Sequence, residues 1–97
     1  MTMRPEKKLA LYIQSAENLI PRDGLESVKH YYKHDEFEMA FEGLILELLK
    51  TDKYPENYDY MQWEELAIYY GLNTESVFDG QFWSKFVKWG TSYQKKG

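Results

Sequence analysis

The chain has 97 residues, which is the length of a single domain. It contains no cysteine, which excludes a disulfide framework, a thiolate metal site and a catalytic thiol. The longest apolar run, residues 43–46, is far shorter than the roughly 20 residues of a membrane span, and no apolar stretch near the N-terminus resembles a secretory signal. We therefore expect one soluble, cytoplasmic domain over residues 1–97.

Charge is distributed unevenly along the chain, whose net charge is −4. Residues 35–65 hold ten carboxylates and two lysines, a net −8, whereas residues 1–34 and 66–97 each carry +2. A dense acidic stretch repels phosphate and therefore disfavours nucleic acid as a partner. It would attract a basic protein and speed that encounter. The alternative is that the acids only solvate helix faces.

The first half of the chain reads as three helices, because its apolar residues recur every three or four positions. The first is predicted from Pro5 to about Leu19 and is ended by residues 21–24. Asp23 is predicted to cap a second helix, which continues through Tyr32. Asp35 is predicted to cap a third helix, which runs to about Leu49.

The second half adds two or three short helices. One is predicted from an N-cap at Asp59 to Gly71, a left-handed end residue. A further helix is predicted from an N-cap at Asn73, with a kink at residues 79–80 before a last amphipathic helix. The tail after Gly90, residues 91–97, is expected to fray. The predicted fold class is all-α, a compact bundle of five to six short helices.

Two predicted helices carry apolar residues on both sides. The core side of the third helix is predicted to hold Phe37, Ala40, Phe41, Leu44, Ile45 and Leu48. Its opposite side mixes acids with apolar residues, namely Asp35, Glu38, Met39, Glu42, Leu46 and Leu49. The fourth helix repeats this pattern, with Met61, Glu64, Glu65 and Ile68 on its outer side. Leu46 and Leu49 fit either a second core face or an interface.

The loop between these helices, residues 53–60, is rich in tyrosine and acid. Tyrosine supplies a large contact area at low entropic cost, so acids around such anchors are typical of a surface for a basic partner. Local aromatic packing is the alternative for these tyrosines. The predicted partner-binding residues are Asp35, Glu38, Met39, Glu42, Tyr54, Glu56, Tyr58, Asp59, Met61, Glu64 and Glu65.

Three more specific functions, namely metal binding, DNA binding and catalysis, have less support in the sequence than this surface. His30 and His34 have the i, i+4 spacing of metal ligands, but a helix break at Asp35 would separate them from Glu38, so two surface histidines are expected and no metal or cofactor site. Ala67, Gly71 and Val77 match the turn of a helix-turn-helix, but no Arg or Lys lies between residues 74 and 81 to meet DNA. No nucleophile motif or phosphate loop indicates an enzyme.

Residues 35–44, Asp-Glu-Phe-Glu-Met-Ala-Phe-Glu-Gly-Leu, resemble a segment of small bacterial immunity proteins, notably the MafI-like group and some that guard against contact-dependent inhibition toxins. The match consists of Glu36, Phe37, Ala40, Phe41, Glu42 and Leu44, with a looser similarity from about Met61 to Phe78. In place of the glycine that often precedes the glutamate in that family, this chain has Asp35.

This resemblance implies a non-catalytic antitoxin that binds and neutralises a cognate toxin domain, typically a nuclease. A nuclease needs a basic cleft, to which an acidic surface with aromatic anchors is complementary. We expect a monomer in a 1:1 complex, with no membrane or nucleic-acid partner. An adaptor or regulatory protein-binding domain, and a helix-turn-helix DNA-binding regulator, remain as alternatives.

Overall fold

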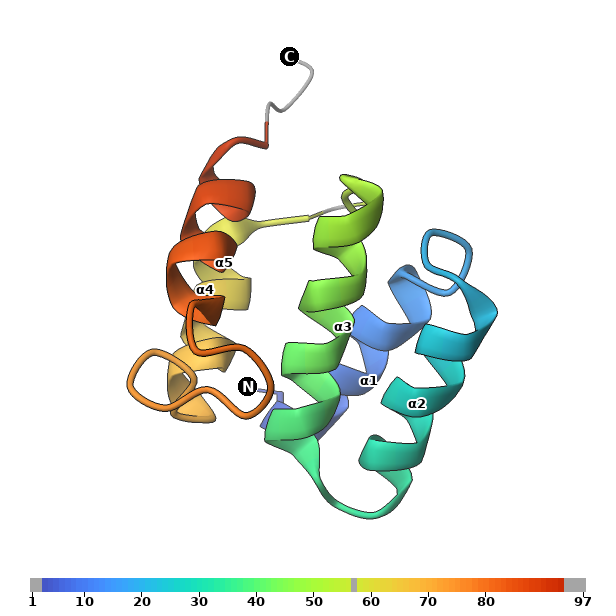
Figure 1. Cartoon of the computed structure of the whole chain (residues 1–97). Helices are drawn as coiled ribbons and strands as arrows, with labels where there is room; N and C mark the ends of the chain where they lie inside the picture. Colours follow the sequence, from blue (N-terminus) through green and yellow to red (C-terminus); the bar gives the residue numbers. More distant parts are fainter. Residues whose placement is uncertain (1–2, 57, 94–97) are drawn as a thin grey trace.

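Helix α3 lies at the centre of a five-helix bundle. The computed structural model describes residues 3–56 and 58–93. α1 (Pro5–Ser15) and α2 (Arg22–Lys33) lie on one side of α3 (Phe37–Thr51), and α4 (Tyr60–Tyr69) and α5 (Phe82–Thr91) lie on the other (Figure 1). α3 packs against each of the other four helices. The predicted all-α bundle is therefore confirmed.

The core is built around the apolar side of α3, as the spacing of its residues predicts. Phe41, Leu44, Ile45 and Leu48 are completely buried, and Phe37 is half-buried. The other helices contribute Leu9 and Ile13 from α1, Val28 from α2, Trp63, Leu66 and Ala67 from α4, and Phe82, Phe86 and Trp89 from α5. A central helix can bury residues over a wide arc because it has neighbours on several sides.

Three helices end on a residue with left-handed backbone geometry. These residues are Asp35 after α2 (φ 60°), Asp52 after α3 (φ 52°) and Gly71 after α4 (φ 76°). After α2, the N–H of Glu36 donates back to the carbonyl of Tyr31 at 2.9 Å, the six-to-one bond of a Schellman motif. Asp35 therefore terminates α2, and the prediction that it caps α3 is wrong. Only two residues separate the C-cap of α2 from α3, so the chain must reverse at Asp35.

The other predicted helix boundaries are partly right. Asp59 is the N-cap of α4, as predicted, and its carboxylate accepts the N–H of Met61 at 3.1 Å. The predicted cap at Asp23 is wrong, since α2 begins at Arg22 and has Pro21 as its N-cap, so Asp23 lies inside the helix. α1 ends at Ser15, and the residues that follow continue as turns with Ala16 buried.

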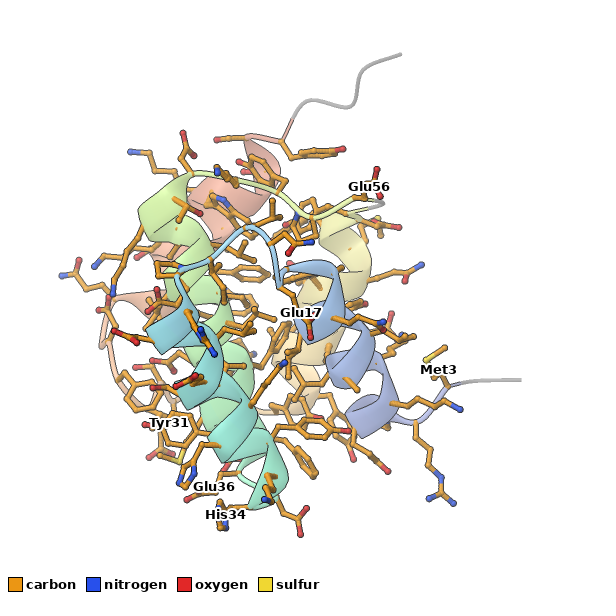
Figure 2. The ribbon with its side chains drawn as sticks, turned by 90° about the vertical axis from the view of Figure 1, so that its right-hand side faces the viewer. Met3, Glu17, Tyr31, His34, Glu36 and Glu56 are labelled. Carbon is orange, nitrogen blue, oxygen red and sulfur yellow. The ribbon has the colours of Figure 1, made fainter. Side chains whose placement is uncertain are left out.

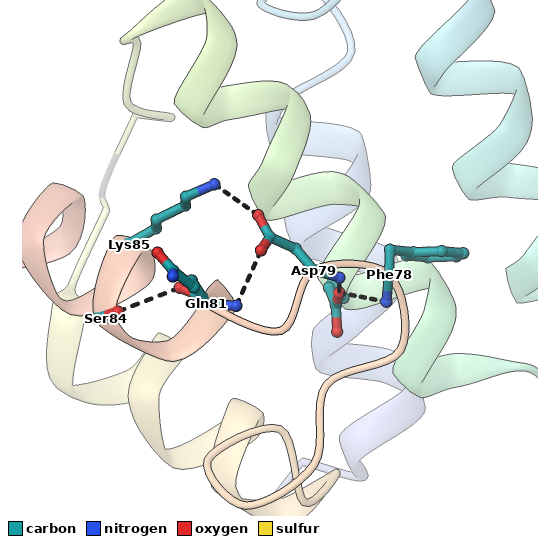
Figure 3. Close-up of polar contacts among 6 residues, drawn as sticks. Phe78, Asp79, Gln81, Ser84 and Lys85 are labelled. Atoms are coloured by element: carbon teal, nitrogen blue, oxygen red, sulfur yellow. Dashed lines mark hydrogen bonds and ion pairs between the residues drawn. The ribbon is translucent and has the colours of Figure 1, made fainter.

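A loop replaces the short helix predicted to begin at Asn73. Glu42 of α3 is completely buried, and its carboxylate accepts the backbone N–H groups of Val77 and Phe78, each at 2.7 Å, and of Asp79 at 3.0 Å. Figure 3 draws the polar contacts around this part of the loop. A helix would use these N–H groups in its own ladder, whereas the buried carboxylate satisfies them directly. The prediction of an exposed Glu42 on a binding face is therefore wrong.

The end of this loop is joined to α5 by a second carboxylate. Asp79 accepts the N–H of Gln81 at 2.9 Å and the ammonium of Lys85 at 2.7 Å (Figure 3). The hydrogen bond from Lys85, followed by that from Gln81, lowers the pKa of the Asp79 carboxyl group. Two carboxylates thus hold the loop. That of Glu42 accepts its backbone N–H groups, and that of Asp79 contacts the first turn of α5.

The tyrosines of the loop before α4 face inward. Tyr58 is 4% exposed and meets Trp63 and Trp89 edge to face, so its predicted place on a binding surface is wrong. Tyr54 stacks on Trp89 with ring centroids 4.7 Å apart, and its hydroxyl donates to the Trp89 carbonyl. Tyr93 packs against both tyrosines, so the described start of the tail is held against the bundle. Residues 94–97 of the expected frayed tail lie outside the described residues.

None of the helices in the described part of the chain combines the length and the apolar character that crossing a membrane requires.

Replacing Glu42 with alanine should destabilise the fold by about 3 kcal/mol or more, because three partly buried N–H groups lose their carboxylate acceptor and a cavity is left in the core. Urea unfolding monitored by circular dichroism measures this change. Glu38→Ala, one turn earlier on the exposed side of α3, should change the free energy of unfolding by no more than about 0.5 kcal/mol. Equal stabilities for the two variants would contradict the role assigned to Glu42.

The buried tyrosines should make the fold sensitive to alkaline pH. Burial, helped by nearby carboxylates, raises the pKa of Tyr12, Tyr60 and Tyr70 to about 12. Above about pH 10 the unfolded chain loses phenol protons that the folded chain keeps, so the free energy of unfolding should fall between about pH 10 and about pH 12. Urea unfolding at a series of pH values measures the loss.

Two phenylalanine variants provide the comparison for this pH dependence. Tyr12→Phe should reduce the alkaline loss, because it removes one proton that the two states hold differently. Tyr69→Phe changes an exposed ring, whose phenol acts on the profile only by adding to the raised pKa of Tyr70, and should reduce the alkaline loss less than Tyr12→Phe does. A profile that neither variant alters would mean that the buried tyrosines are not its cause.

Candidate partner-binding surface

The eleven residues predicted to bind a partner do not share one face. Glu42 and Tyr58 are buried, and Met39, Tyr54 and Glu64 are half-buried. The exposed members are Asp35, Glu38, Glu56, Asp59, Met61 and Glu65. The inward-facing residues are engaged within the molecule, for example Glu64, which accepts the Tyr60 hydroxyl at 3.0 Å.

The exposed acids fall into two groups at opposite ends of α3. Asp35 and Glu38 lie where α2 gives way to α3, whereas Glu56 and Asp59 lie between the end of α3 and the start of α4. Figure 2 shows this separation, with Glu36 and Glu56 at opposite ends of the molecule. The 15 residues of α3 span about 22 Å. A single docking site therefore cannot be centred on both groups.

The second group continues along the outer side of α4. Met61 is 74% exposed, Ile68 47% and Tyr69 66%, and Glu65 lies between them. Together with Asp59 these residues form a surface that we call the α4 face. The spacing of 61, 65 and 68 follows a helical stripe, as the sequence predicts. The sequence-based prediction did not include Tyr69, although it lies four residues after Glu65 and therefore on the same outer side of α4.

The acids of the α4 face have no ion-pair partner among the described residues. The ion pairs found there involve other carboxylates, those of Glu6, Glu17, Glu26, Glu47 and Asp79. The described cations therefore leave Asp59 and Glu65 without direct neutralisation. This arrangement presents negative charge beside exposed apolar side chains, which is the chemistry that a basic, partly apolar surface would complement.

A shallow hollow extends the α4 face towards the start of α1. It has a volume of about 390 Å³ and is lined by Met3, Lys8, Glu65 and Tyr69, among others. Met3 is 42% exposed and adds apolar surface, while Arg4 and Lys8 bring two positive charges to this edge. The α4 face is therefore more negative on the side of Asp59 than on the side of α1.

A larger hollow of about 670 Å³ lies over α3, between α2 and the loop held by Glu42. Leu46 and Leu49 line it and are half-buried, so they belong neither to the closed core nor to a fully exposed surface. Tyr31 and Phe78 meet at one of its edges, with ring centroids 5.6 Å apart. We call this hollow the α3 groove.

The structure does not form the helix-turn-helix motif. Gly71 provides the expected tight turn, but the residues after it form the loop held by Glu42 and not a second helix. No group of three or more His, Cys, Asp or Glu side chains is placed to hold a metal ion within residues 3–56 and 58–93.

Comparison of the chain with protein-family models, with curated proteins and with solved structures gives no match.

Alanine substitutions along α4 should separate its two faces. Met61→Ala and Ile68→Ala should each change the free energy of unfolding by no more than about 0.5 kcal/mol, because both side chains are largely in water. Leu66→Ala, on the inner face of the same helix, should cost about 2–5 kcal/mol. Thermal or urea unfolding measures all three, and a comparable loss at Ile68 would place that residue in the core.

Proposed function

We propose that this chain is a non-enzymatic binding protein that holds a basic partner protein on the α4 face. We further propose that the partner is a toxin domain, for example a nuclease, which the chain neutralises in a 1:1 complex. The observation that carries the proposal is the exposure of Met61, Ile68 and Tyr69 beside carboxylates that lack an ion-pair partner among the described residues.

The α4 face would gain binding free energy from its apolar side chains and selectivity from its carboxylates. Exposed apolar side chains that are covered by a partner contribute free energy through loss of water contact. The carboxylates of Asp59 and Glu65 would select a partner that brings Lys or Arg, and would speed the encounter at low salt. Tyr69 supplies a rigid aromatic contact with a hydroxyl at its tip.

The resemblance to immunity proteins supports the proposal less directly than the α4 face does. Of the residues that carry it, Ala40, Phe41, Glu42 and Leu44 are buried. These residues determine how α3 packs and how the loop after α4 is held, so they relate to the fold rather than to partner contacts. The looser similarity, from about Met61 to Phe78, covers the α4 face.

The experiment begins with the open reading frames beside the gene. A large secreted protein with a basic C-terminal domain is the expected neighbour, and that domain is titrated with the chain in a calorimeter. Removing one charge of the α4 face and reversing another, Asp59→Asn with Glu65→Lys, should weaken binding by about 2 kcal/mol or more if the acids meet buried bases. Asparagine keeps the N-cap of α4. The same variant should lose protection of cells that express the toxin domain.

A matched variant reverses two exposed acids of α2, Asp23→Lys with Glu26→Lys, which lie across α3 from α4 (Figure 1). At physiological salt the screening length is about 8 Å, so this change should cost no more than about 0.5 kcal/mol. Equal losses for both variants would contradict a site on the α4 face. A neighbouring basic domain that does not bind the chain at all would contradict the toxin assignment.

The α3 groove favours the adaptor alternative. A concave, largely apolar surface of this size could hold a short segment of another protein. Leu46→Asp would replace an apolar side chain of the groove with a charged one, and it would leave the α4 face unchanged. An adaptor that uses the groove should lose its partner with this variant and retain it when Glu65 is reversed, which is the opposite of the result expected for the toxin inhibitor.

A further inference from the structure

We propose that His30 and His34 form a two-ligand site for a divalent transition-metal ion at the end of α2. The site does not depend on the partner proposed above. Two imidazoles one helical turn apart can bind one ion through a nitrogen from each ring, with water in the remaining positions.

The helix break at Asp35 separates the histidine pair from Glu38, as the sequence predicts, but it leaves the two histidines together. α2 continues without a break to Lys33, and His34 is its C-cap residue, so both histidines lie on one helix. Their ring centroids are 4.4 Å apart, which is close enough for one ion to reach a nitrogen of each. Both residues are exposed, so an ion can enter without rearrangement of the fold.

The ring nitrogens have no competing partner within residues 3–56 and 58–93. None of the side-chain hydrogen bonds in this part of the chain involves either imidazole. A neutral imidazole keeps one lone pair for coordination, and no described group occupies it here. Tyr31 packs edge-on near His30, with centroids 6.1 Å apart, and restricts the movement of that ring.

The surroundings favour positive charge. The C-terminal end of a helix carries the negative end of its dipole, and the pair occupies that end of α2. The carboxylates of Asp35 and Glu36 follow directly in the sequence, and Figure 2 shows Glu36 beside His34 at this end of the molecule. A bound cation would therefore be stabilised by the field as well as by its two ligands.

The ligand type identifies the class of ion. Imidazole suits Zn²⁺, Ni²⁺ and Cu²⁺, and affinity should follow the order in which Cu²⁺ is tightest, whereas Mg²⁺ prefers oxygen ligands. Because no third His, Cys, Asp or Glu joins the pair within the described residues, the expected affinity is that of a two-ligand surface site, well below that of a structural zinc site.

The test uses the full chain, stripped of metal and titrated with Zn²⁺ or Cu²⁺ by calorimetry. One ion per chain is expected, with Cu²⁺ tighter than Zn²⁺ and no heat from Mg²⁺. His30→Ala and His34→Ala should each weaken binding by about tenfold or more, since loss of even an outer-shell contact costs about 10- to 100-fold. Both residues are exposed, so neither variant should disturb the fold.

Lys33→Ala is the control, because it changes an exposed residue between the two histidines and removes no ligand. Its affinity for Zn²⁺ should be no weaker than that of the unaltered chain, because the change removes a neighbouring positive charge and no ligand. In a second readout, Cu²⁺ should broaden the NMR signals of residues around 30–34 before any others. Absence of binding, or a histidine variant that binds Zn²⁺ as tightly as the unaltered chain, would overturn the proposal.

Discussion

The buried carboxylate of Glu42 is the contact on which the arrangement of the second half of the chain depends. It lies on the central helix and accepts three consecutive backbone N–H groups from the loop that joins α4 to α5. A carboxylate without exposure to water needs hydrogen-bond donors from the protein, and here the loop supplies three. The same contact excludes a helix at residues 77–79, and it places Phe78 at the edge of the α3 groove.

The aromatic residues have a comparable effect at the opposite end of α3. Tyr54 and Tyr58 pack against Trp89 and Trp63, which joins the loop before α4 to both helices on that side of the bundle. Tyrosines of this loop thereby join the core, because packing against the tryptophans removes their rings from water. The surface left for a partner moves from this loop to the outer side of α4.

The candidate site therefore consists of fewer residues than the acidic stretch implies. Asp59, Met61 and Glu65 remain exposed at and along α4, and neither acid forms an ion pair among the described residues, whereas Glu38 lies at the end of α3 opposite to Asp59. Charge concentrated in sequence need not be concentrated in space, because a helix of 15 residues separates its two ends by about 22 Å. A docking surface on α4 and a metal-binding histidine pair on α2 can then operate independently.

Local patterns of the sequence were sufficient for the five observed helices, the core side of α3, the cap at Asp59 and the outer stripe of α4, since each depends on spacing or on contacts within a few residues. They also predicted a helix after Asn73 that the structure replaces with a loop. They were not sufficient for Glu42 or Tyr58, whose environments are made by segments far away in the chain. A glutamate in an acidic helical stripe has the same local signature whether it meets water or three N–H groups 35 to 37 residues away. That difference is a long-range pairing, and it exists only once the helices have packed.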